Sequence, residues 1–202
     1  MPRDRSELAG KARRLGWIAA TVVWGAALVV GLFLLSRYKF TPGTAADAPT
    51  RWPTSSALVR AADRPALVFF AHPLCPCTRT SIDELESLLA NAGGAVDTHV
   101  VVLRYEEGGD PSETLSRVRR IPGVAVHLDD GSEAARFGAR TSGQTLVYGV
   151  DGTLRFEGGI TSARGHAGDN AGKRSVASMI RNGSADGATS SVFGCALQGG
   201  ER

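Results

Sequence analysis

One uncharged stretch divides this chain of 202 residues into two unequal parts. No charged residue occurs between Trp17 and Leu35. At a rise of about 1.5 Å per residue, a helix of this length crosses a bilayer core of about 30 Å. The stretch therefore predicts a transmembrane anchor over residues 15–36, preceded by a basic cytoplasmic tail over residues 1–14.

Basic residues are more frequent before the anchor than after it. Five of them precede it: Arg3, Arg5, Lys11, Arg13 and Arg14. Only Arg37 and Lys39 follow it closely. Positive charge is retained on the cytoplasmic side of a membrane, so the N-terminus is expected inside. The sequence thus predicts a single-pass protein of the cytoplasmic (inner) membrane whose C-terminal domain faces the periplasm or another extracytoplasmic space.

A cleaved signal peptide is the alternative to an anchor. The apolar part of such a peptide usually spans about 7–15 residues and has a small-residue cleavage site close behind it. Here the apolar run is longer, and the nearest such triplet, Ala46-Asp47-Ala48, lies well downstream and precedes Pro49. These features favour an uncleaved anchor.

The basic isoelectric point comes from the N-terminal part alone. From Arg51 onward the chain has 16 Lys and Arg residues against 17 Asp and Glu residues, so this part is close to neutral. The positive tail suits an anionic inner leaflet, and the near-neutral domain argues against a nucleic-acid partner. Residues 37–60 are rich in Pro, Thr, Ala and Ser and are expected to form a flexible tether before a domain over residues 61–202.

Two cysteines follow directly after an apolar run. Ala66–Ala71 has the composition of a strand that is covered on both faces, and Cys75 and Cys77 precede an amphipathic helix. A strand-to-helix junction directs free backbone N–H groups and a positive helix end at its residues, which stabilises a thiolate. With a third cysteine far away at Cys195, the motif indicates a working site rather than a structural disulfide.

The remaining elements alternate between strands and helices. We expect further strands at 99–103, 124–128, 145–150 and 153–156, and helices ending near 91–94 and spanning 110–120, 132–137 and 170–180. Asp110 and Pro111 are expected to cap and begin the second of these helices. Asp151-Gly152 is a hairpin signal. The order βαβαβαββα indicates an α/β or α+β sandwich of three layers.

The order of elements, with cysteines after the first central strand, resembles the thioredoxin fold over roughly residues 60–180. The segments His72-Pro73-Leu74-Cys75-Pro76-Cys77, 137–152, 165–172 and Phe193-Gly194-Cys195 are similar to those of RedB-type proteins. The resemblance implies a thioredoxin-like three-layer α/β/α sandwich with a mixed central sheet, here preceded by one transmembrane helix. It also implies a membrane-anchored, extracytoplasmic thiol-disulfide chemistry.

Three positions depart from the pattern of the thioredoxin family. Leu74 stands where the family has its nucleophilic cysteine, so Cys75 comes one residue late. Gly143 or Gln144 stands where the family has a cis-proline that faces the active site and binds extended substrates. Val68 replaces an acidic residue of the central strand. These differences predict a substrate unlike that of ordinary thioredoxins.

Four residues are the candidates for catalysis. Cys75, expected to be exposed, is the predicted nucleophile, and Cys77, further into the helix, is the predicted resolving cysteine. A disulfide between these two would close a small, strained ring. His72 is a candidate general base or thiolate-stabilising cation, and equally a surface histidine. Cys195 is a candidate second resolving thiol, docked by Val192, Phe193 and Leu197, or a structural cysteine.

A glycine-rich loop at 158–170 follows the last predicted strand of the hairpin. In the resembled fold this segment lies beside the cysteine motif, so Arg164, His166 and Asn170 are expected near the site. The alternative is a connection that ends in a helix cap at Asp169 or Asn170. Gly143 and Gln144 complete this candidate site loop.

Three classes of function remain open. The first is a thiol-disulfide oxidoreductase that needs no cofactor and acts on a protein or small-molecule thiol or disulfide partner. The second resembles the Sco-type copper chaperones, with Cys75, Cys77, His72 and Cys195 as ligands for copper or another soft metal. The third is a non-catalytic thioredoxin-like adaptor, which the missing proline and acid favour.

Overall fold

The computed structural model describes residues 5–104, 112–182 and 188–197. The chain forms two compact units that meet in the sequence at Lys39 and Phe40. We describe each unit by itself.

The first unit is dominated by helix α1, Arg5–Phe40. Its part from Gly10 to Phe40 has a mean hydropathy of 2.5 and is long and apolar enough to cross a membrane. None of that apolar window is buried against protein. The helix extends beyond the predicted anchor at both ends, so residues 37–40 are helical and do not belong to a tether.

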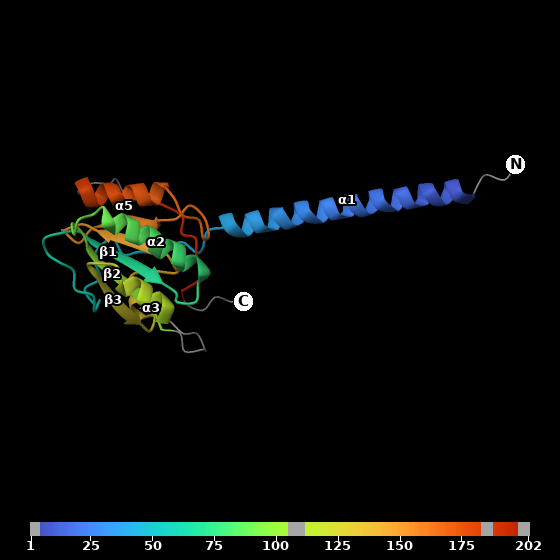
Figure 1. Ribbon diagram of the computed structural model, residues 1–202. Coiled ribbons are helices and arrows are strands. Elements are labelled where there is room, and N and C mark those ends of the chain that lie inside the picture. The colour runs from blue at the N-terminus through green and yellow to red at the C-terminus, as the bar shows by residue number, and fades with distance from the viewer. Residues whose placement is uncertain (1–4, 105–111, 183–187, 198–202) are drawn as a thin grey trace. The chain divides into compact units, whose positions relative to one another are not determined.

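The second unit is built on a six-stranded mixed sheet (Figure 1). Its strands are β1 (Ala66–Ala71), β2 (Asp97–Leu103), β3 (Val124–Asp129), β4 (Gln144–Tyr148), β5 (Leu154–Gly159) and β6 (Ala188–Thr189), in the order β3-β2-β1-β4-β5-β6. Strand β1 runs parallel to β2 and antiparallel to β4. Buried β1 is therefore central, as its uninterrupted apolar run predicts.

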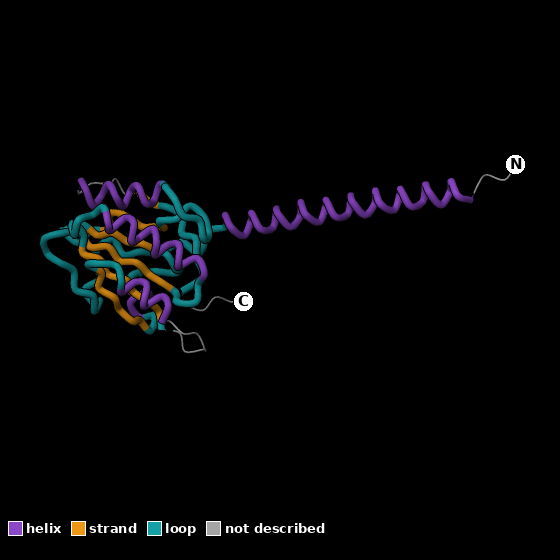
Figure 2. The backbone as a smooth tube through the Cα atoms, viewed as in Figure 1, coloured by secondary structure: helices purple, strands orange, loops and turns teal. Residues whose placement is uncertain are grey.

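Three helices, α2 (Pro76–Ala90), α3 (Ser112–Arg119) and α5 (Ala171–Asn182), cover one face of the sheet (Figure 1; Figure 2). Alternate β1 residues Leu67 and Phe69 point into this core, while Val68 and Phe70 point into the other. The short helix α4 (Ser132–Arg136) belongs to the opposite core. This arrangement is a three-layer sandwich, as expected. The expected helix start at Asp110 and Pro111 lies outside the described residues.

Residues 41–60, which we call the strap, pack on the second face instead of forming a loose tether. Trp52 contacts the rings of Phe137 and Tyr148 edge-on, with centroids 5.0 and 5.3 Å apart. The Tyr148 hydroxyl donates to the Pro49 carbonyl over 3.1 Å. The domain therefore begins near Phe40 rather than near residue 61. The Pro- and Ser-rich composition failed as a signal of looseness because one aromatic anchor and a few polar contacts suffice to fix an extended chain.

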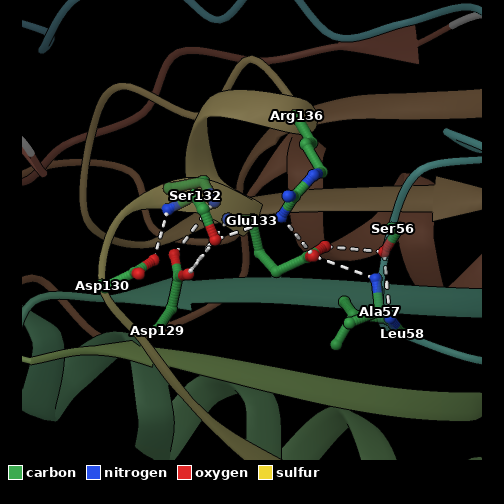
Figure 3. A network of polar contacts seen from close by, with 9 residues as sticks. Ser56, Ala57, Leu58, Asp129, Asp130, Ser132, Glu133 and Arg136 are labelled. Atoms are coloured by element: carbon green, nitrogen blue, oxygen red, sulfur yellow. Dashed lines mark hydrogen bonds and ion pairs between the residues drawn. The ribbon is translucent and has the colours of Figure 1, made fainter.

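A polar network fastens the strap to α4 (Figure 3). The Glu133 carboxylate accepts hydrogen bonds from the Ser56 hydroxyl at 2.6 Å and the Ala57 N–H at 3.0 Å. Arg136 completes an ion pair with the same carboxylate at 2.8 Å. Beside it, Asp129 accepts from the N–H groups of Glu133 and Ala134, so the last residue of β3 caps the start of α4.

Candidate active site

Cys75 lies where the chain turns from β1 into α2. It occupies the N-cap position of α2, with Pro76 as the first helical residue. Proline suits this position because it lacks an N–H that would have no partner inside the helix. The buried residues Ile82, Leu85 and Leu88 hold α2 against the sheet. The junction therefore places the Cys75 sulfur at the positive end of the helix.

The C-terminal segment, residues 192–197, meets Cys75 and is called the tail below. The Cys195 N–H donates to the Cys75 sulfur over 3.3 Å. The tail also pairs with the chain just before β4: the Ser142 N–H donates to the Cys195 carbonyl at 2.8 Å, and the Leu197 N–H to the Arg140 carbonyl at 2.9 Å. The structure thus brings Cys195, for which the sequence left a resolving and a structural role open, to the Cys-Pro-Cys motif.

Hydrogen-bond donors converge on the Cys75 sulfur. The Cys195 thiol contributes most, followed by the Thr78 hydroxyl and the backbone N–H groups of Cys195 and Cys77. Together they outweigh burial, which acts in the opposite direction, and lower the pKa of Cys75 to about 4. Cys75 is therefore a thiolate at neutral pH.

The other two thiols keep their protons. Burial raises the pKa of Cys77, and the neighbouring negative charge of Cys75 adds to this, while Arg164 acts in the opposite direction. The pKa of Cys195 is raised chiefly because its thiol donates to Cys75. All three cysteines are free in the structure. The site thus combines one thiolate with two thiols.

The expected exposure of Cys75 is wrong. Its exposed fraction is 3%, and that of Cys77 is 8%. The tail covers Cys75, and no local sequence pattern predicts this long-range contact. In contrast, the adjacent Leu74 has 44% of its surface exposed and is available to a partner.

His72 is half-buried in the loop between β1 and Cys75. Its backbone N–H donates to the Ser142 hydroxyl at 2.8 Å, and its ring Nδ1 accepts from the Leu74 backbone N–H at 3.2 Å. Burial lowers the pKa of His72, while the charge of Cys75 raises it. The ring therefore helps to shape the loop that carries Cys75, and its neutral form is favoured.

Gly143 and Gln144 lie at the start of β4, where the resemblance places a cis-proline. There is no cis peptide bond among the described residues. Gly143 instead has a φ of 90°, a value that favours glycine, and its N–H donates to the Phe70 carbonyl at 2.8 Å. Gln144 is fully buried and accepts from the Arg140 N–H. The turn reaches β1 without proline.

The candidate loop brings only one of its three named side chains to the thiols. Arg164 donates to the Gly194 carbonyl of the tail and acts on Cys77. His166 is exposed, and Asn170 caps α5 by accepting from the Lys173 N–H at 2.9 Å. The helix-cap alternative therefore holds for Asn170.

Two site residues were missed by sequence reasoning. The hydroxyls of Thr78 and Ser142 are 2.7 Å apart and link α2 to the turn before β4. Thr78 is recognisable in principle, because it follows Cys77 in the first turn of the helix. Ser142 carries no such signal, since only the fold brings it to the motif.

Within the part of the chain that the structure describes, no three His, Cys, Asp or Glu side chains are arranged to hold a metal ion. The cysteines hydrogen-bond to one another and to backbone groups instead. What the arrangement provides chemically is a nucleophilic thiolate with two thiols beside it.

Comparisons with known proteins identify relatives in structure only. No family model matches the sequence, and no curated protein matches it. A hypothetical protein from Sinorhizobium meliloti 1021 shares 21% identity at a TM-score of 0.56, covering 78% of this chain and 93% of its own. An uncharacterised conserved protein from Geobacillus kaustophilus shares 16% identity at a TM-score of 0.56, covering 81% and 94%.

A secreted disulfide oxidoreductase of Mycobacterium tuberculosis, homologous to E. coli DsbE, is also similar, with 19% identity and a TM-score of 0.42 over 59% of this chain and 81% of its own. In the present chain, β1-α2-β2 forms a parallel unit and β4-β5-α5 an antiparallel one, joined through the pairing of β1 with β4. This arrangement of strands and helices gives the chain a thioredoxin-like fold.

Proposed function

We propose that this protein is a membrane-anchored, extracytoplasmic thiol-disulfide oxidoreductase in which Cys75 is the nucleophile. The observation that carries the proposal is the set of donors around the Cys75 sulfur at the start of α2. A thiolate is the form of cysteine that attacks a disulfide. A cysteine with a purely structural role needs no such stabilisation.

The proposed reaction exchanges two thiols for one disulfide. The Cys75 thiolate attacks one sulfur of a partner disulfide, which forms a mixed disulfide and releases the other partner sulfur as a thiolate that takes up a proton. A second cysteine of this chain then loses its proton and attacks the Cys75 sulfur. That step releases the partner as a dithiol and leaves an intramolecular disulfide. The sequence nominates Cys77 first and Cys195 second for the resolving role.

The compartment is proposed from the anchor and its flanking charges. Helix α1 is long and apolar enough to span a membrane, and the excess of basic residues before its uncharged stretch favours an inside N-terminus. The domain then faces a compartment in which disulfides form and persist. An exchange partner there is a protein or small molecule that carries a thiol or disulfide.

A redox titration of the full chain in detergent tests this function. The protein is equilibrated in thiol–disulfide buffers of graded potential, free thiols are alkylated, and the mass shift is measured. We expect Cys75 to lose its reactivity together with one other cysteine at a single midpoint potential. Thiols that do not interconvert at any accessible potential would rule the function out.

Two measurements separate the alternatives. Thiolates are the ligands that Cu(I) prefers, so anaerobic titration of the reduced chain with Cu(I) tests the chaperone-like function, and binding weaker than micromolar removes it. Full complementation of a deletion strain by the Cys75→Ser, Cys77→Ser double variant would instead support the adaptor.

A further inference from the structure

The tail lies against the site in the manner of an extended peptide. Antiparallel pairing joins Thr141 to Ala196, and the backbone bonds of Ser142 and Leu197 flank that pair. This pairing places the residue at position 195 directly over the Cys75 sulfur, and that residue is a cysteine. A segment that adds to a backbone edge in this way is held by main-chain bonds and positioned by its side chains.

The contact is built closely rather than loosely. An added Cβ on Gly194 would stand 1.9 Å from the Ser142 carbonyl oxygen, so only glycine allows this approach. Arg164 donates to the Gly194 carbonyl from the opposite loop. Val192 and Leu197 are buried at the two ends of the tail. Together these contacts fix the course of the tail and, with it, the position of Cys195 over the Cys75 sulfur.

We propose that Cys195 is the resolving thiol of Cys75, and that the tail is a built-in peptide that vacates the site for a partner disulfide and then returns to complete the reaction. The inference rests on the proposed function and specifies its second step. In that step the Cys195 sulfur, having given up its proton, attacks the Cys75 sulfur of the mixed disulfide. The Cys75–Cys195 bond forms, the Cys75–partner bond breaks, and the partner leaves as a thiolate that is then protonated.

The geometry favours Cys195 over Cys77 for this step. Cys75 and Cys77 are separated by one residue at the rigid start of a helix, where a disulfide would close a strained ring. Cys195 arrives on a separate segment and already hydrogen-bonds to Cys75. A bond between these two sulfurs would join separate segments and would not close a small ring at the start of α2.

Electrostatics also gives the two steps an order. The hydrogen bond that the Cys195 thiol donates to Cys75 and the negative charge of Cys75 both raise the pKa of Cys195. When Cys75 becomes part of a mixed disulfide, both of these influences end and the pKa of Cys195 falls, although burial still favours the thiol and is opposed by Arg164. The resolving thiol is therefore activated after the first step and not before it. The exposed surface of Cys75 is 3%, so a partner reaches it only when the tail has moved.

The test compares the full chain and its Cys77→Ser and Cys195→Ser variants in detergent. Each reduced protein is mixed with oxidised glutathione or a disulfide-bonded peptide, quenched, and mapped by mass spectrometry without reduction. Cys75 and Cys77 share the tryptic peptide 61–79, whereas Cys195 lies in 182–202, so the two possible disulfides are distinguishable. We expect the Cys77→Ser variant to form the Cys75–Cys195 link, and the Cys195→Ser variant to accumulate the mixed disulfide.

A matched pair of glycine variants, one in the tail and one outside it, leaves every thiol in place. Gly194→Val prevents the close approach to Ser142 and should slow release of the mixed disulfide by about tenfold or more, because a tethered thiol acts through its high effective concentration. Gly16→Val makes the same replacement in α1, where an added Cβ meets no atom within 4 Å, and should release it at the rate of the unaltered chain. The Cys195→Ser variant keeps Gly194 and reports on the thiol alone if Gly194→Val folds poorly.

The outcomes separate this inference from the function on which it rests. If the unaltered chain turns over through a Cys75–Cys77 disulfide and Cys195→Ser does so equally fast, Cys195 does not resolve and the inference is wrong. If Cys75→Ser turns over as fast as the unaltered chain, the proposed function itself is wrong.

Discussion

At the scale of single residues, the acidity of Cys75 is the property that most directly determines reactivity. Its pKa of about 4 lies far below the ordinary value of a cysteine thiol. Alkylation of Cys75 by iodoacetamide should therefore keep a nearly constant rate from pH 9 down to about pH 5 and fall towards pH 4. The measurement is the second-order rate constant for Cys75 modification across that range in the Cys77→Ser variant. A rate that falls tenfold per pH unit below pH 8 would contradict it.

The same pKa shift has a consequence for stability. Unfolded Cys75 holds its proton up to about pH 9, whereas the folded thiol releases it near pH 4. The unfolded state therefore binds more protons in this range, and the contribution of Cys75 to the stability of the reduced protein rises from about pH 4 to about pH 9. Stability supplied by this group is lost as the pH falls through 4.

Thr78 supplies one of the donors that hold Cys75 in its charged form. A hydrogen bond to a charged group contributes about 1.5–3 kcal/mol, and about 1.4 kcal/mol corresponds to one pKa unit. Thr78→Val should therefore raise the pKa of Cys75 by about one to two units, measured by thiolate absorbance or alkylation. Thr80→Val, two residues further along the same helix, is the matched control and should leave the profile in place.

At the scale of elements, strands and helices with strong local patterns were predicted well. Ala66–Ala71 is a strand over the predicted residues, because its apolar run suits a position buried on both faces. The strap was not predicted, because its packing rests on Trp52 reaching Phe137, far away in the sequence. The two-residue strand β6 was not predicted either, since its pairing with β5 comes from the fold and not from its composition.

Because the strap is attached to α4 through Glu133, loss of this carboxylate should loosen the strap. Glu133→Ala removes the acceptor of Ser56 and Ala57, at a cost of about 1–3 kcal/mol for the unpaired groups. Trypsin should then cut faster after Arg51 and Arg60 in the variant than in the unaltered chain. Glu86→Ala on the exposed side of α2 serves as the control. Equal cleavage rates for both variants would show that Glu133 does not hold the strap.

A histidine pair between β2 and β3 predicts how stability depends on pH. His127 lies 3.1 Å from the ring of His99, which contacts Asp97 at 3.2 Å. Burial and the charge of His99 lower the pKa of His127, against the opposite influence of Glu133 and Asp97. The unfolded chain therefore takes up a proton near pH 6.5 that the folded chain resists.

The contribution of His127 to stability should thus be lost as the pH falls below about 6.5. Urea unfolding at pH 7.5 and pH 5.5 measures the difference, and His127→Gln should reduce it while keeping a hydrogen-bonding group at this position. The exposed His166→Gln is the control. A difference between the two pH values that is unchanged in His127→Gln would assign it to other groups.

At the scale of the whole molecule, the order of elements gave the thioredoxin-like sandwich, but the composition of the site required the three-dimensional structure. Cys75 and Cys77 could be recognised from the sequence because they lie between the predicted strand β1 and helix α2. Cys195 reaches Cys75 from far along the sequence, and Ser142 contacts Cys195, His72 and Thr78 around it. The pairing that brings these residues together leaves no local pattern. The predicted exposure of Cys75 failed for that reason.

The topology of the chain carries the last prediction. Five basic residues before the uncharged stretch against two closely after it favour an inside N-terminus. In intact spheroplasts, externally added trypsin should digest the domain, and an N-terminal tag should remain protected until the membrane is opened. Replacing Lys11, Arg13 and Arg14 by Gln should reduce the fraction in this orientation. A protected domain would contradict the topology, and a released domain that begins near residue 49 would identify a cleaved signal instead of an anchor. Because disulfides persist outside the cytoplasm and are kept reduced within it, this orientation also decides whether the Cys75 thiolate meets partner disulfides at all.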